Sequence, residues 1–435
     1  MISTESHNKE RKSAKSITMI SEKLKIKKRE SCRICDSTLL KPLYSIGEQY
    51  INNFIRKDEI KKCIKAPLEM VICDNCTLLQ LKHTAPQELL YARYYWYKSG
   101  VTVTMNKALR DITSKVEIMF DLKEGDVVLD IGSNDGTLLR SYSVPGLITI
   151  GVEPADNLLE EGKQGLTYHI HDFWNHDVYE KIVQKKAKII TAIGMFYDME
   201  DPNQFIADVE KVLCDDGVFI SQLMCLKNML DSNDVGNICH EHLEYYSFKS
   251  LEYLFNRNSL QIFDVEINNV NGGSYRVYAK KMGAIVQENK GAFKRVQLVR
   301  DSENGLDSKK VHINFFNRLE ENKRKCTDFI KKEVAKGKTV WVYGASTKGN
   351  VILQYYGLDH TLIEAASERS SWKWGKYTVG TMIPCVPEDE ARKAQPDYFL
   401  VLPYAFLDEF YEREKEWRKK GGKFLVPLPE FRVVS

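Results

Sequence analysis

The sequence predicts an α/β protein in which a small cysteine-containing module precedes two Rossmann-like domains, each built on a parallel sheet. Three observations predict this organisation. Four cysteines form two CxxC pairs near the start of the chain. Two later stretches alternate short apolar strands with helical segments, which is the pattern of βαβ units. The 435 residues are enough for about three domains of ordinary size.

The composition excludes several broad classes of protein. With 43% hydrophobic and 28% charged residues, the chain can bury a core of ordinary size and is not disordered as a whole. The 63 basic and 60 acidic residues leave a net charge of +3, which argues against a dedicated nucleic-acid binder. No apolar run predicts a membrane span, and the polar start of the chain does not resemble a signal peptide.

Ten cysteines in a chain this long do not indicate a disulfide scaffold. We therefore expect a cytoplasmic enzyme without a nucleic-acid or membrane partner.

Residues 1–29 predict a disordered basic tail. They hold nine basic residues and very few large apolar ones, so they cannot form a packed core of their own. Contact with a nucleic acid or a membrane is the alternative, and a solvated tail is the interpretation that we adopt.

Residues 30–85 predict a small zinc-binding module. Each CxxC pair presents two thiolates on one side of a tight turn, and two such pairs complete a tetrahedral zinc site. Four protein ligands leave no open position, so the metal would be structural, and a unit with so little core would need it. The alternatives are one redox-active pair or unrelated core cysteines. The expected ligands are Cys32, Cys35, Cys73 and Cys76.

From residue 86 the pattern changes to alternating strands and helices. In the first α/β domain, residues 86–285, apolar strands are expected at 126–131, 147–152, 187–193 and 217–222, with a late strand at 276–281. A connector over 286–336 contains a charged segment with apolar residues at helical spacing, which predicts a helix over 301–336. In a second domain, residues 337–435, strands are expected at 339–343, 362–366, 398–402 and 423–426.

The first strand of the larger domain runs into a glycine turn that predicts a nucleoside-binding site. Glycine lets the backbone approach a ligand closely, and Gly132 and Gly136 flank Asn134, which stands where a strict GxGxxG turn has glycine. Glu153 ends the second strand, where a carboxylate can accept hydrogen bonds from a ribose. The turn is compatible with NAD, FAD or S-adenosylmethionine. Asp130 favours S-adenosylmethionine, because a carboxylate there can hold the ammonium of the methionine part and would repel a pyrophosphate.

Two further positions complete this expected cofactor site. Asp172 and Phe173 follow the third strand-like segment and are suited to contact an adenine. The alternative for Phe173 is an ordinary core aromatic.

A polar cluster at 237–247 gathers most of the reactive side chains of the chain. It could be a metal site, a general acid/base pair or structural polar packing. The spacing of His240 and His242 differs from the i, i+4 spacing of a zinc-protease helix, and in an extended segment the two would share a face. We favour a general base, with Glu241 as the neighbour that fixes the tautomer of the histidine.

The turn at 344–350 predicts a phosphate-binding loop. Gly344, Lys348 and Asn350 follow a strand, and such a turn offers backbone N–H groups together with one cation. The alternative is that the start of a helix requires glycine there.

Taken together, these motifs resemble those of bacterial C-methyltransferases that act on nucleotide-linked 4-keto-hexoses in deoxysugar biosynthesis. The resemblance covers nearly the whole chain after the tail. It includes the cysteine module and the segment YWYKSG at 95–100, followed in the family's order by DIGSNDGTLL, GVEPADN, MFYDMEDP, HEHLEYYS and NGGSYRVY. In the last third, YGASTKGN and the segment around Pro427 match as well.

The resemblance implies a three-domain enzyme with structural Zn²⁺ and S-adenosylmethionine as cofactors. It makes residues 86–285 the methyltransferase domain and residues 337–435 the domain that holds a nucleotide-sugar. It implies methyl transfer to a carbon next to a ketone, C3 of the sugar being expected, through an enolate made by His242 with Glu241 orienting it. The substrate-binding residues that it implies are Tyr95, Tyr97, Asn271, Arg276, Gly344, Lys348 and Asn350. The expected partner is the nucleotide-linked keto-sugar, and we expect a monomer.

One position departs from the family's pattern. A tyrosine three positions before the base is replaced by Cys239, and a thiol is a shorter and weaker hydrogen-bonding group. The group that stabilises the enolate is therefore left open, with Cys239 and His240 as further candidate catalytic residues. Methyl transfer to oxygen or nitrogen, and a non-catalytic ligand-binding scaffold, are the alternative functions.

Overall fold

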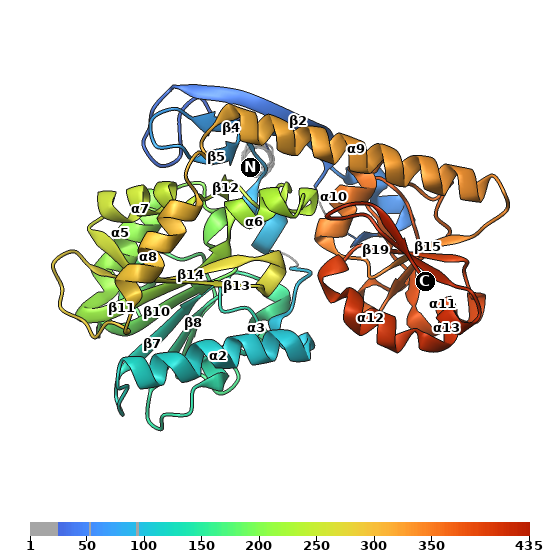
Figure 1. The fold of residues 1–435 in the computed structure, drawn as a ribbon. Helices are drawn as coiled ribbons and strands as arrows, with labels where there is room; N and C mark the ends of the chain where they lie inside the picture. The colour runs from blue at the N-terminus through green and yellow to red at the C-terminus, as the bar shows by residue number, and fades with distance from the viewer. Residues whose placement is uncertain (1–24, 52–53, 93–94) are drawn as a thin grey trace, which may run out of the picture.

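The computed structural model describes residues 25–51, 54–92 and 95–435. It contains a small N-terminal module, a central α/β domain and a C-terminal α/β domain, and one long helix lies along the module and the C-terminal domain (Figure 1). The predicted tail at 1–24 lies outside the described residues. The rest of it differs from the prediction, because β1 (Lys27–Lys28) pairs antiparallel with β6 (His83–Thr84).

The N-terminal module is an antiparallel sheet to which the central domain contributes one strand. Its strand order is β12-β5-β4-β2, where β2 is Leu40–Tyr50, β4 is Lys65–Cys73, β5 is Leu79–Leu81 and β12 is Glu244–Tyr245. β12 pairs with β5 through Glu244 opposite Gln80 and Tyr245 opposite Leu79. The module is therefore attached to the polar cluster of the central domain.

A loop of the module is also bound to the central domain by an asparagine. The side-chain amide of Asn203 donates to the backbone carbonyls of Arg33 and Ile34, at 3.0 and 2.9 Å. The Arg33 guanidinium is buried and donates to Thr84 Oγ1 at 2.7 Å. The Asn203 contacts fix the first cysteine pair against the central domain, and the Arg33 contact joins it to β6 of its own module.

The central domain is a seven-stranded sheet of order β13-β14-β11-β10-β7-β8-β9. All of its pairs are parallel except those that β14 makes with β11 and β13. The strands are β7 (Val127–Ile131), β8 (Ile148–Val152), β9 (Tyr168–Ile170), β10 (Ala187–Ile193), β11 (Leu213–Met224), β13 (Leu260–Asn268) and β14 (Ser274–Lys281). Its helices are α2 (Val103–Met119), α3 (Leu159–Gly162), α4 (His176–Glu180), α5 (Pro202–Val212), α6 (Leu226–Asp231) and α7 (Phe248–Arg257).

Helices cover both faces of this sheet, as its continuous apolar strands require. On one face, Ile112 and Val116 of α2 pack in one cluster with Val128 of β7. On the other face, the apolar sides of α5 and α7 pack in a second cluster that includes Leu129 and Phe219. α2 begins after Thr102, whose hydroxyl accepts a hydrogen bond from the Met105 backbone at 3.2 Å, a standard N-cap.

Two helices and a smaller sheet complete the chain. α8 (Ala292–Ser302) and α9 (Lys309–Val334) form the connector, whereas the sequence predicted one helix there. The C-terminal sheet has the order β18-β16-β15-β19-β20-β21. Its elements are β15 (Val340–Tyr343), α10 (Thr347–Tyr356), β16 (Ala366–Glu368), β18 (Cys385–Pro387), α11 (Glu388–Ala394), β19 (Tyr398–Val401), α12 (Leu407–Arg413), α13 (Lys415–Lys419), β20 (Lys423–Val426) and β21 (Arg432–Val434).

The module also contacts the C-terminal parts of the chain directly. β3 (Phe54–Ile55) pairs with β17 (Tyr377–Thr378), and the Tyr50 backbone donates to the side-chain carbonyl of Gln354 in α10 at 2.8 Å. The Tyr44 ring of β2 stacks on Phe316 of α9 at 5.4 Å between centroids. The module therefore bridges the two α/β domains.

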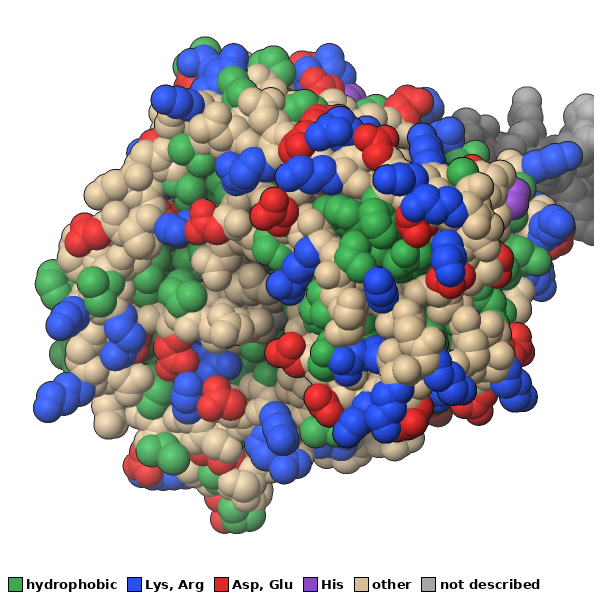
Figure 2. All heavy atoms as spheres, turned by 45° about the vertical axis from the view of Figure 1, so that its right-hand side comes forward, with side chains coloured by type: hydrophobic (Ala, Val, Ile, Leu, Met, Phe, Trp, Pro, Cys, Tyr) green, Lys and Arg blue, Asp and Glu red, His purple; other side chains and the backbone are tan. Residues whose placement is uncertain are grey.

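The predicted strands at 187–193 and 423–426 have the observed bounds, and β11 is longer than predicted. The predicted strand at 362–366 differs, because β16 begins only at Ala366. Within the described part of the chain, no helix has the length and apolar character to cross a membrane. The face shown in Figure 2 carries basic and acidic side chains intermixed, as the small net charge of +3 leads one to expect.

Candidate active site and metal centre

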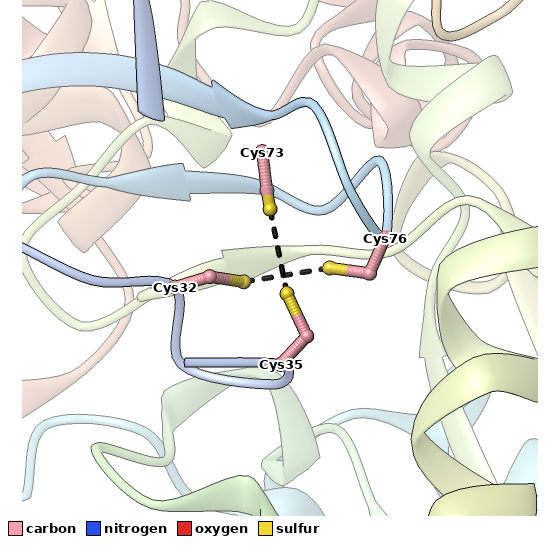
Figure 3. A group of neighbouring side chains, drawn as sticks. All are labelled: Cys32, Cys35, Cys73 and Cys76. Carbon is pink, nitrogen blue, oxygen red and sulfur yellow. Dashed lines mark hydrogen bonds between the residues drawn. The ribbon is translucent and has the colours of Figure 1, made fainter. Parts of the chain in front are cut away.

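The four cysteines of the module converge on one point (Figure 3). Their Sγ atoms all lie within 4.8 Å of one another, with 3.4 Å between Cys32 and Cys76 and 3.5 Å between Cys35 and Cys73. Zn–S bonds of about 2.3 Å in a tetrahedron place sulfurs about 3.8 Å apart, so the thiolates fit a zinc ion after a small adjustment. Because all four ligands come from the protein, the centre is structural.

A cavity of about 400 Å³ lies at the carboxyl ends of β7, β8, β10 and β11. Open parallel sheets bind their ligands at this edge. Asp130, Gly132 and Glu153 line one part of the cavity, and Asn237 lines another. Lys348 of α10 reaches the same cavity from the C-terminal domain. The site is therefore shared between two domains.

The glycine turn after β7 adopts the conformation that the sequence predicted. Gly132 and Gly136 have φ angles of 70° and 78°. A Cβ at Gly132 would lie 2.9 Å from Cγ of Met195, and one at Gly136 would lie 2.8 Å from the carbonyl oxygen of Gly162. Both positions therefore require glycine, and the backbone at Gly132 forms part of the cavity wall.

Asn134 connects this turn to the segment that leads into α2. Its side chain accepts a hydrogen bond from the Ser99 backbone at 2.9 Å and donates to the Tyr97 carbonyl at 3.2 Å. The backbone of Tyr95 is held in a similar way by the side chain of Asn157, at 2.9 and 3.1 Å. Both Tyr95 and Tyr97 line the cavity.

The Glu153 carboxylate is fixed at the end of β8 by the backbone. It accepts hydrogen bonds from the N–H groups of Asn134 and Ala155, each at 3.0 Å. Burial raises the pKa of this carboxyl, and the two N–H groups oppose that shift. A buried carboxylate with remaining acceptor capacity suits the two hydroxyls of a ribose.

The Asp130 carboxyl is suited to bind a positively charged group of a ligand. Its Oδ1 accepts a hydrogen bond from Thr191 at 2.6 Å, and burial raises the pKa of its carboxyl to about 7. A bound ammonium group would stabilise the charged carboxylate. Asp130 and Glu153 are therefore suited to the methionine ammonium and to the ribose of S-adenosylmethionine, respectively.

The two residues expected to contact an adenine differ in their placement. Phe173 lines the cavity and remains 37% exposed, so it is free to stack on a planar base. Asp172 does not line the cavity, and its Oδ1 accepts a hydrogen bond from the Phe173 backbone at 2.7 Å. The carboxylate therefore shapes the local turn, in contrast to the predicted cofactor contact.

His242 lies on a turn rather than on an extended segment, and it does not itself line the cavity, which is lined by its neighbours Tyr197 and Asn237. Its backbone N–H donates to the Cys239 carbonyl at 3.2 Å. Its Nδ1 lies 2.9 Å from the carbonyl oxygen of Asn237, and its ring contacts the Tyr197 ring edge to face at 4.5 Å. Burial, together with the charge of Lys348, lowers the pKa of His242 to about 3. The ring is therefore neutral at physiological pH.

The neighbours of His242 do not have the roles that the sequence predicted. The Asn237 carbonyl fixes the tautomer at Nδ1, a role expected of Glu241, whose own backbone carbonyl accepts the Tyr91 hydroxyl at 2.8 Å. His240 does not share a face with His242, because its Nε2 lies 2.9 Å from the Ala66 carbonyl of the module. Burial lowers its pKa to about 4.

Cys239 is a buried thiol close to several acidic groups. Burial raises its pKa well above the ordinary value, and the charges of Glu241 and Asp198 add to that shift. A thiol in this environment stays protonated and is a poor base.

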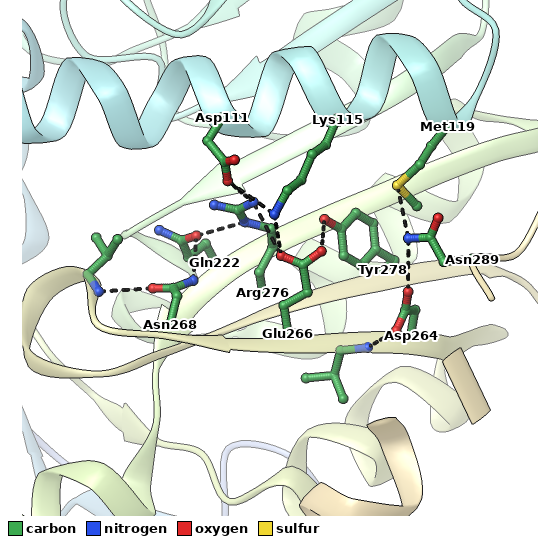
Figure 4. Close-up of polar contacts among 12 residues, drawn as sticks. Asp111, Lys115, Met119, Gln222, Asp264, Glu266, Asn268, Arg276, Tyr278 and Asn289 are labelled. Atoms are coloured by element: carbon green, nitrogen blue, oxygen red, sulfur yellow. Dashed lines mark hydrogen bonds and ion pairs between the residues drawn. The ribbon is translucent and has the colours of Figure 1, made fainter. Parts of the chain in front are cut away.

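The remaining predicted substrate residues lie in three different places. Gly344 and Asn350 flank the start of α10 without lining the cavity, whereas Lys348 does line it. Asn271 lies in a short turn before β14. Arg276 is only 2% exposed and is held in a polar network between α2 and the sheet (Figure 4). Its guanidinium is therefore occupied by protein partners, in contrast to the prediction of substrate contact.

Sequence reasoning missed three residues of the site. Asn237 and Asp198 line the cavity, and each has a buried oxygen without a hydrogen-bond partner among the described residues. Asp234 is buried and accepts the side-chain amide of Asn237 at 2.7 Å. Asp198 lies in the segment MFYDMEDP and Asn237 begins the polar cluster at 237–247, so their positions could have indicated a role. The contact of Asp234 depends on the local turn.

Sequence comparison assigns a family description to each part of the chain. Residues 32–91 match the family "Putative zinc binding domain", residues 104–265 match "Methyltransferase domain", and residues 269–429 match "C-methyltransferase C-terminal domain". With the cavity and the cysteine centre, these matches define an S-adenosylmethionine-dependent C-methyltransferase of three domains. C-methyltransferase NovU of Streptomyces niveus is 29% identical over 410 residues, which cover 93% of this chain and 97% of that protein.

Two solved methyltransferase structures resemble part of the chain. A S-adenosylmethionine-dependent methyltransferase from Clostridium acetobutylicum is 14% identical and covers 41% of this chain and 92% of its own, with a TM-score of 0.33. Magnesium protoporphyrin IX methyltransferase of Synechocystis, with bound SAH, is 11% identical and covers 43% of this chain and 90% of its own, also with a TM-score of 0.33. The predicted fold class, enzyme class and cofactors are confirmed by the family matches and the cysteine cluster.

Proposed function

We propose that this enzyme methylates a carbon next to the ketone of a nucleotide-linked 4-keto-deoxyhexose, most simply C3, through an enolate. The observation that carries the proposal is the position of Lys348, which belongs to the C-terminal domain and lines the cavity of the methyltransferase domain. A substrate that bridges the two domains explains why the cofactor cavity is built from both. A nucleotide-sugar is long enough to reach from one domain to the other and carries a diphosphate at its centre.

The start of α10 suits this diphosphate. Ser346 caps the helix by accepting the Gly349 N–H at 2.9 Å, and the first turn of a helix carries partial positive charge. The positive charge of Lys348 acts on His242 and on the buried carboxyls of Asp234 and Asp198. We assign the binding of the nucleotide part to residues 337–435 for this reason.

His242 is the proposed base. A C–H bond becomes acidic enough to break only beside a carbonyl, so the enzyme needs a neutral base close to the ketone. Because Nδ1 donates to the Asn237 carbonyl, the lone pair of the ring lies on Nε2. A diphosphate at Lys348 would offset the charge that lowers the pKa of His242, so substrate binding would make the ring a stronger base.

Asp130 and Glu153 hold the methyl donor in this proposal. S-adenosylmethionine, when bound, supplies an electrophilic methyl group on a sulfonium. Asp130 binds its ammonium, Glu153 binds its ribose, and Phe173 stacks on its adenine. Methyl transfer to the enolate carbon forms one C–C bond, breaks one S–C bond, and leaves the abstracted proton on His242.

The direct test is an assay with a panel of nucleotide-linked 4-keto-deoxyhexoses and S-adenosylmethionine carrying a labelled methyl group. Mass spectrometry should find one labelled methyl group on a sugar carbon. In D₂O without the methyl donor, the same enzyme should exchange the hydrogen next to the ketone. Labelled product without this exchange would indicate methyl transfer to oxygen or nitrogen, and no labelled sugar in any reaction would reject the proposal.

A further inference from the structure

The network that holds Arg276 points to a neighbouring side chain in the cavity. Gln222 lies near the carboxyl end of β11, opposite Arg276 of β14, and it is only 3% exposed. Unlike Arg276, Gln222 lines the cavity. The arginine therefore acts on the cavity through this glutamine.

Two donors fix the orientation of the Gln222 amide. Its Oε1 accepts a hydrogen bond from Arg276 Nε at 2.9 Å and another from Asn268 Nδ2 at 3.1 Å. Asn268 is itself oriented, since its Oδ1 accepts the Val270 N–H at 3.0 Å. With both donors on the oxygen, the NH₂ group of Gln222 must point away from them, as Figure 4 shows.

The donors themselves are held by α2 and the sheet. Arg276 Nη1 lies 2.8 Å from Asp111 of α2 and 3.5 Å from Glu266 of β13. Lys115 bridges the same two carboxylates at 3.3 and 3.0 Å. A network with this many charge-assisted contacts keeps the glutamine from rotating.

The NH₂ group of Gln222 donates to no residue in the described part of the chain. Leu109 of α2 and Ser274 of β14 line the same cavity as Gln222. A buried amide with a satisfied oxygen and an unused NH₂ group can only donate, so it suits an acceptor oxygen of a ligand.

The sheet order separates this position from the cofactor residues. Glu153 follows β8, and Gln222 lies on β11, with β7 and β10 between them. Strands are about 4.8 Å apart, so three steps place Gln222 roughly 14 Å from the ribose site and about 10 Å from Asp130 on β7. Gln222 therefore lies on the far side of Asp130 from Glu153, outside the positions assigned to the ammonium and the ribose.

We propose that Gln222 is a substrate-binding residue whose NH₂ group donates a hydrogen bond to an oxygen of the sugar that is methylated, with Arg276 and Asn268 as its positioning residues. This inference rests on the proposed function. It replaces the direct contact expected of Arg276 by an indirect one.

Two variants test this proposal. Gln222→Glu keeps the size of the side chain and an oxygen for Arg276, but it removes the NH₂ donor. Gln222→Met removes the polar group altogether. One neutral hydrogen bond is worth about 3- to 10-fold, so kcat/KM for the keto-sugar should fall by at least about that factor in both variants. The dissociation constant of S-adenosylmethionine should stay within about twofold of the wild-type value. Asn289→Ala is the matched control, because this amide contacts Asp264 and Met119 in the same region and does not line the cavity.

The outcomes separate this inference from the proposed function. If the wild-type enzyme methylates no nucleotide-linked keto-sugar, the proposed function fails. If it does and both variants retain full kcat/KM, the Gln222 proposal is overturned. The proposal is also overturned if the affinity for S-adenosylmethionine falls by the same factor as kcat/KM for the keto-sugar, because the amide would then contact the methyl donor. If the affinities for the keto-sugar and for S-adenosylmethionine fall equally and the melting temperature also falls, Gln222 has a purely structural role.

Discussion

The Nδ1 atom of His242 lies 2.9 Å from the backbone carbonyl oxygen of Asn237. A carbonyl can only accept, so Nδ1 carries the proton and Nε2 carries the lone pair. A main-chain carbonyl cannot be removed by a side-chain substitution. The tautomer of His242 therefore depends on the fold of the turn, and on Asp234, which holds the side chain of Asn237.

His242→Gln should retain the fold and the affinity for the methyl donor, and should lose turnover by about 100-fold or more. The substitution keeps a side chain of similar size and removes the basic nitrogen. Deuterium exchange next to the ketone, followed by mass spectrometry without methyl donor, should disappear as well. His240→Gln is the matched control, and exchange that persists in His242→Gln but vanishes in His240→Gln would make His240 the base.

His240 and His242 should each destabilise the native state as the pH falls from 7 to 5, whereas the Asp130 carboxyl, whose pKa is raised to about 7 by burial, acts in the opposite direction. Burial lowers the pKa of His240 to about 4, and burial with the charge of Lys348 lowers that of His242 to about 3. An unfolded histidine has a pKa of about 6.5. Below that pH the unfolded chain binds protons at both positions and the native chain does not, so the free energy of unfolding falls by roughly 2 kcal/mol for each histidine.

Urea unfolding of the wild-type enzyme and of His240→Gln, at pH 7 and pH 5, measures this difference. The variant should lose less stability over the interval than the wild type does. Zinc content is determined at both pH values, because release of the metal would also weaken the fold. Identical pH dependence in the two proteins at constant zinc content would contradict the prediction.

Natively purified protein should contain one zinc ion per chain, and Cys32→Ser should lose it and unfold at a lower temperature. The four sulfurs lie within 4.8 Å of one another, and a structural site contributes its binding energy to folding. Elemental analysis and thermal unfolding check this expectation. Cys326→Ser provides a control, since Cys326 is buried in α9 away from the cluster and should leave the zinc content unchanged.

Glu153→Ala should raise the dissociation constant of S-adenosylmethionine about tenfold or more, which corresponds to about 1.4 kcal/mol. The carboxylate lies at the end of β8 and lines the cavity, so its loss removes the acceptor for the ribose. Isothermal titration calorimetry measures the change. Asp172→Ala is a suitable comparison, because that carboxylate does not line the cavity, and equal affinities for the wild type and Glu153→Ala would reject the assignment.

Lys348→Ala should raise KM for the nucleotide-sugar several-fold and leave the affinity for S-adenosylmethionine unchanged. The side chain carries the positive charge that reaches the cavity from the C-terminal domain. Steady-state kinetics and calorimetry separate the two effects. Lys348→Arg should restore much of the lost affinity for the nucleotide-sugar. If Lys348→Ala weakens the binding of both ligands equally, the variant is misfolded instead.

The local signals in the sequence predicted the strands and the glycine turn well. The short and mostly apolar runs Ala187–Ile193 and Lys423–Val426 predicted strands, and the strands of the structure have the same bounds. Glycines at 132 and 136 predicted a tight turn because few other residues adopt those φ angles. The positions of Asp130 and Glu153 follow from their places at strand ends.

The contacts that depend on pairing between distant segments could not be predicted. Arg276 looked like a substrate residue because it stands in a motif, and only the pairing of β11 with β14 shows that it contacts Gln222. Glu241 is adjacent to His242 in the sequence, but the turn gives the Nδ1 contact to Asn237. Lys27 and Lys28 form a strand because a partner strand lies more than fifty residues further along the chain.

The pairing of β12 with β5 determines what a smaller version of this enzyme would lack. Only one residue, Leu243, separates His242 from Glu244, whose strand completes the sheet of the N-terminal module. A chain shortened to begin at residue 86 would keep the strands of the proposed donor site, but the turn that carries His242 would lose its neighbouring strand on one side. If His242 is the base, as proposed, a minimal catalytic fragment has to include the N-terminal module.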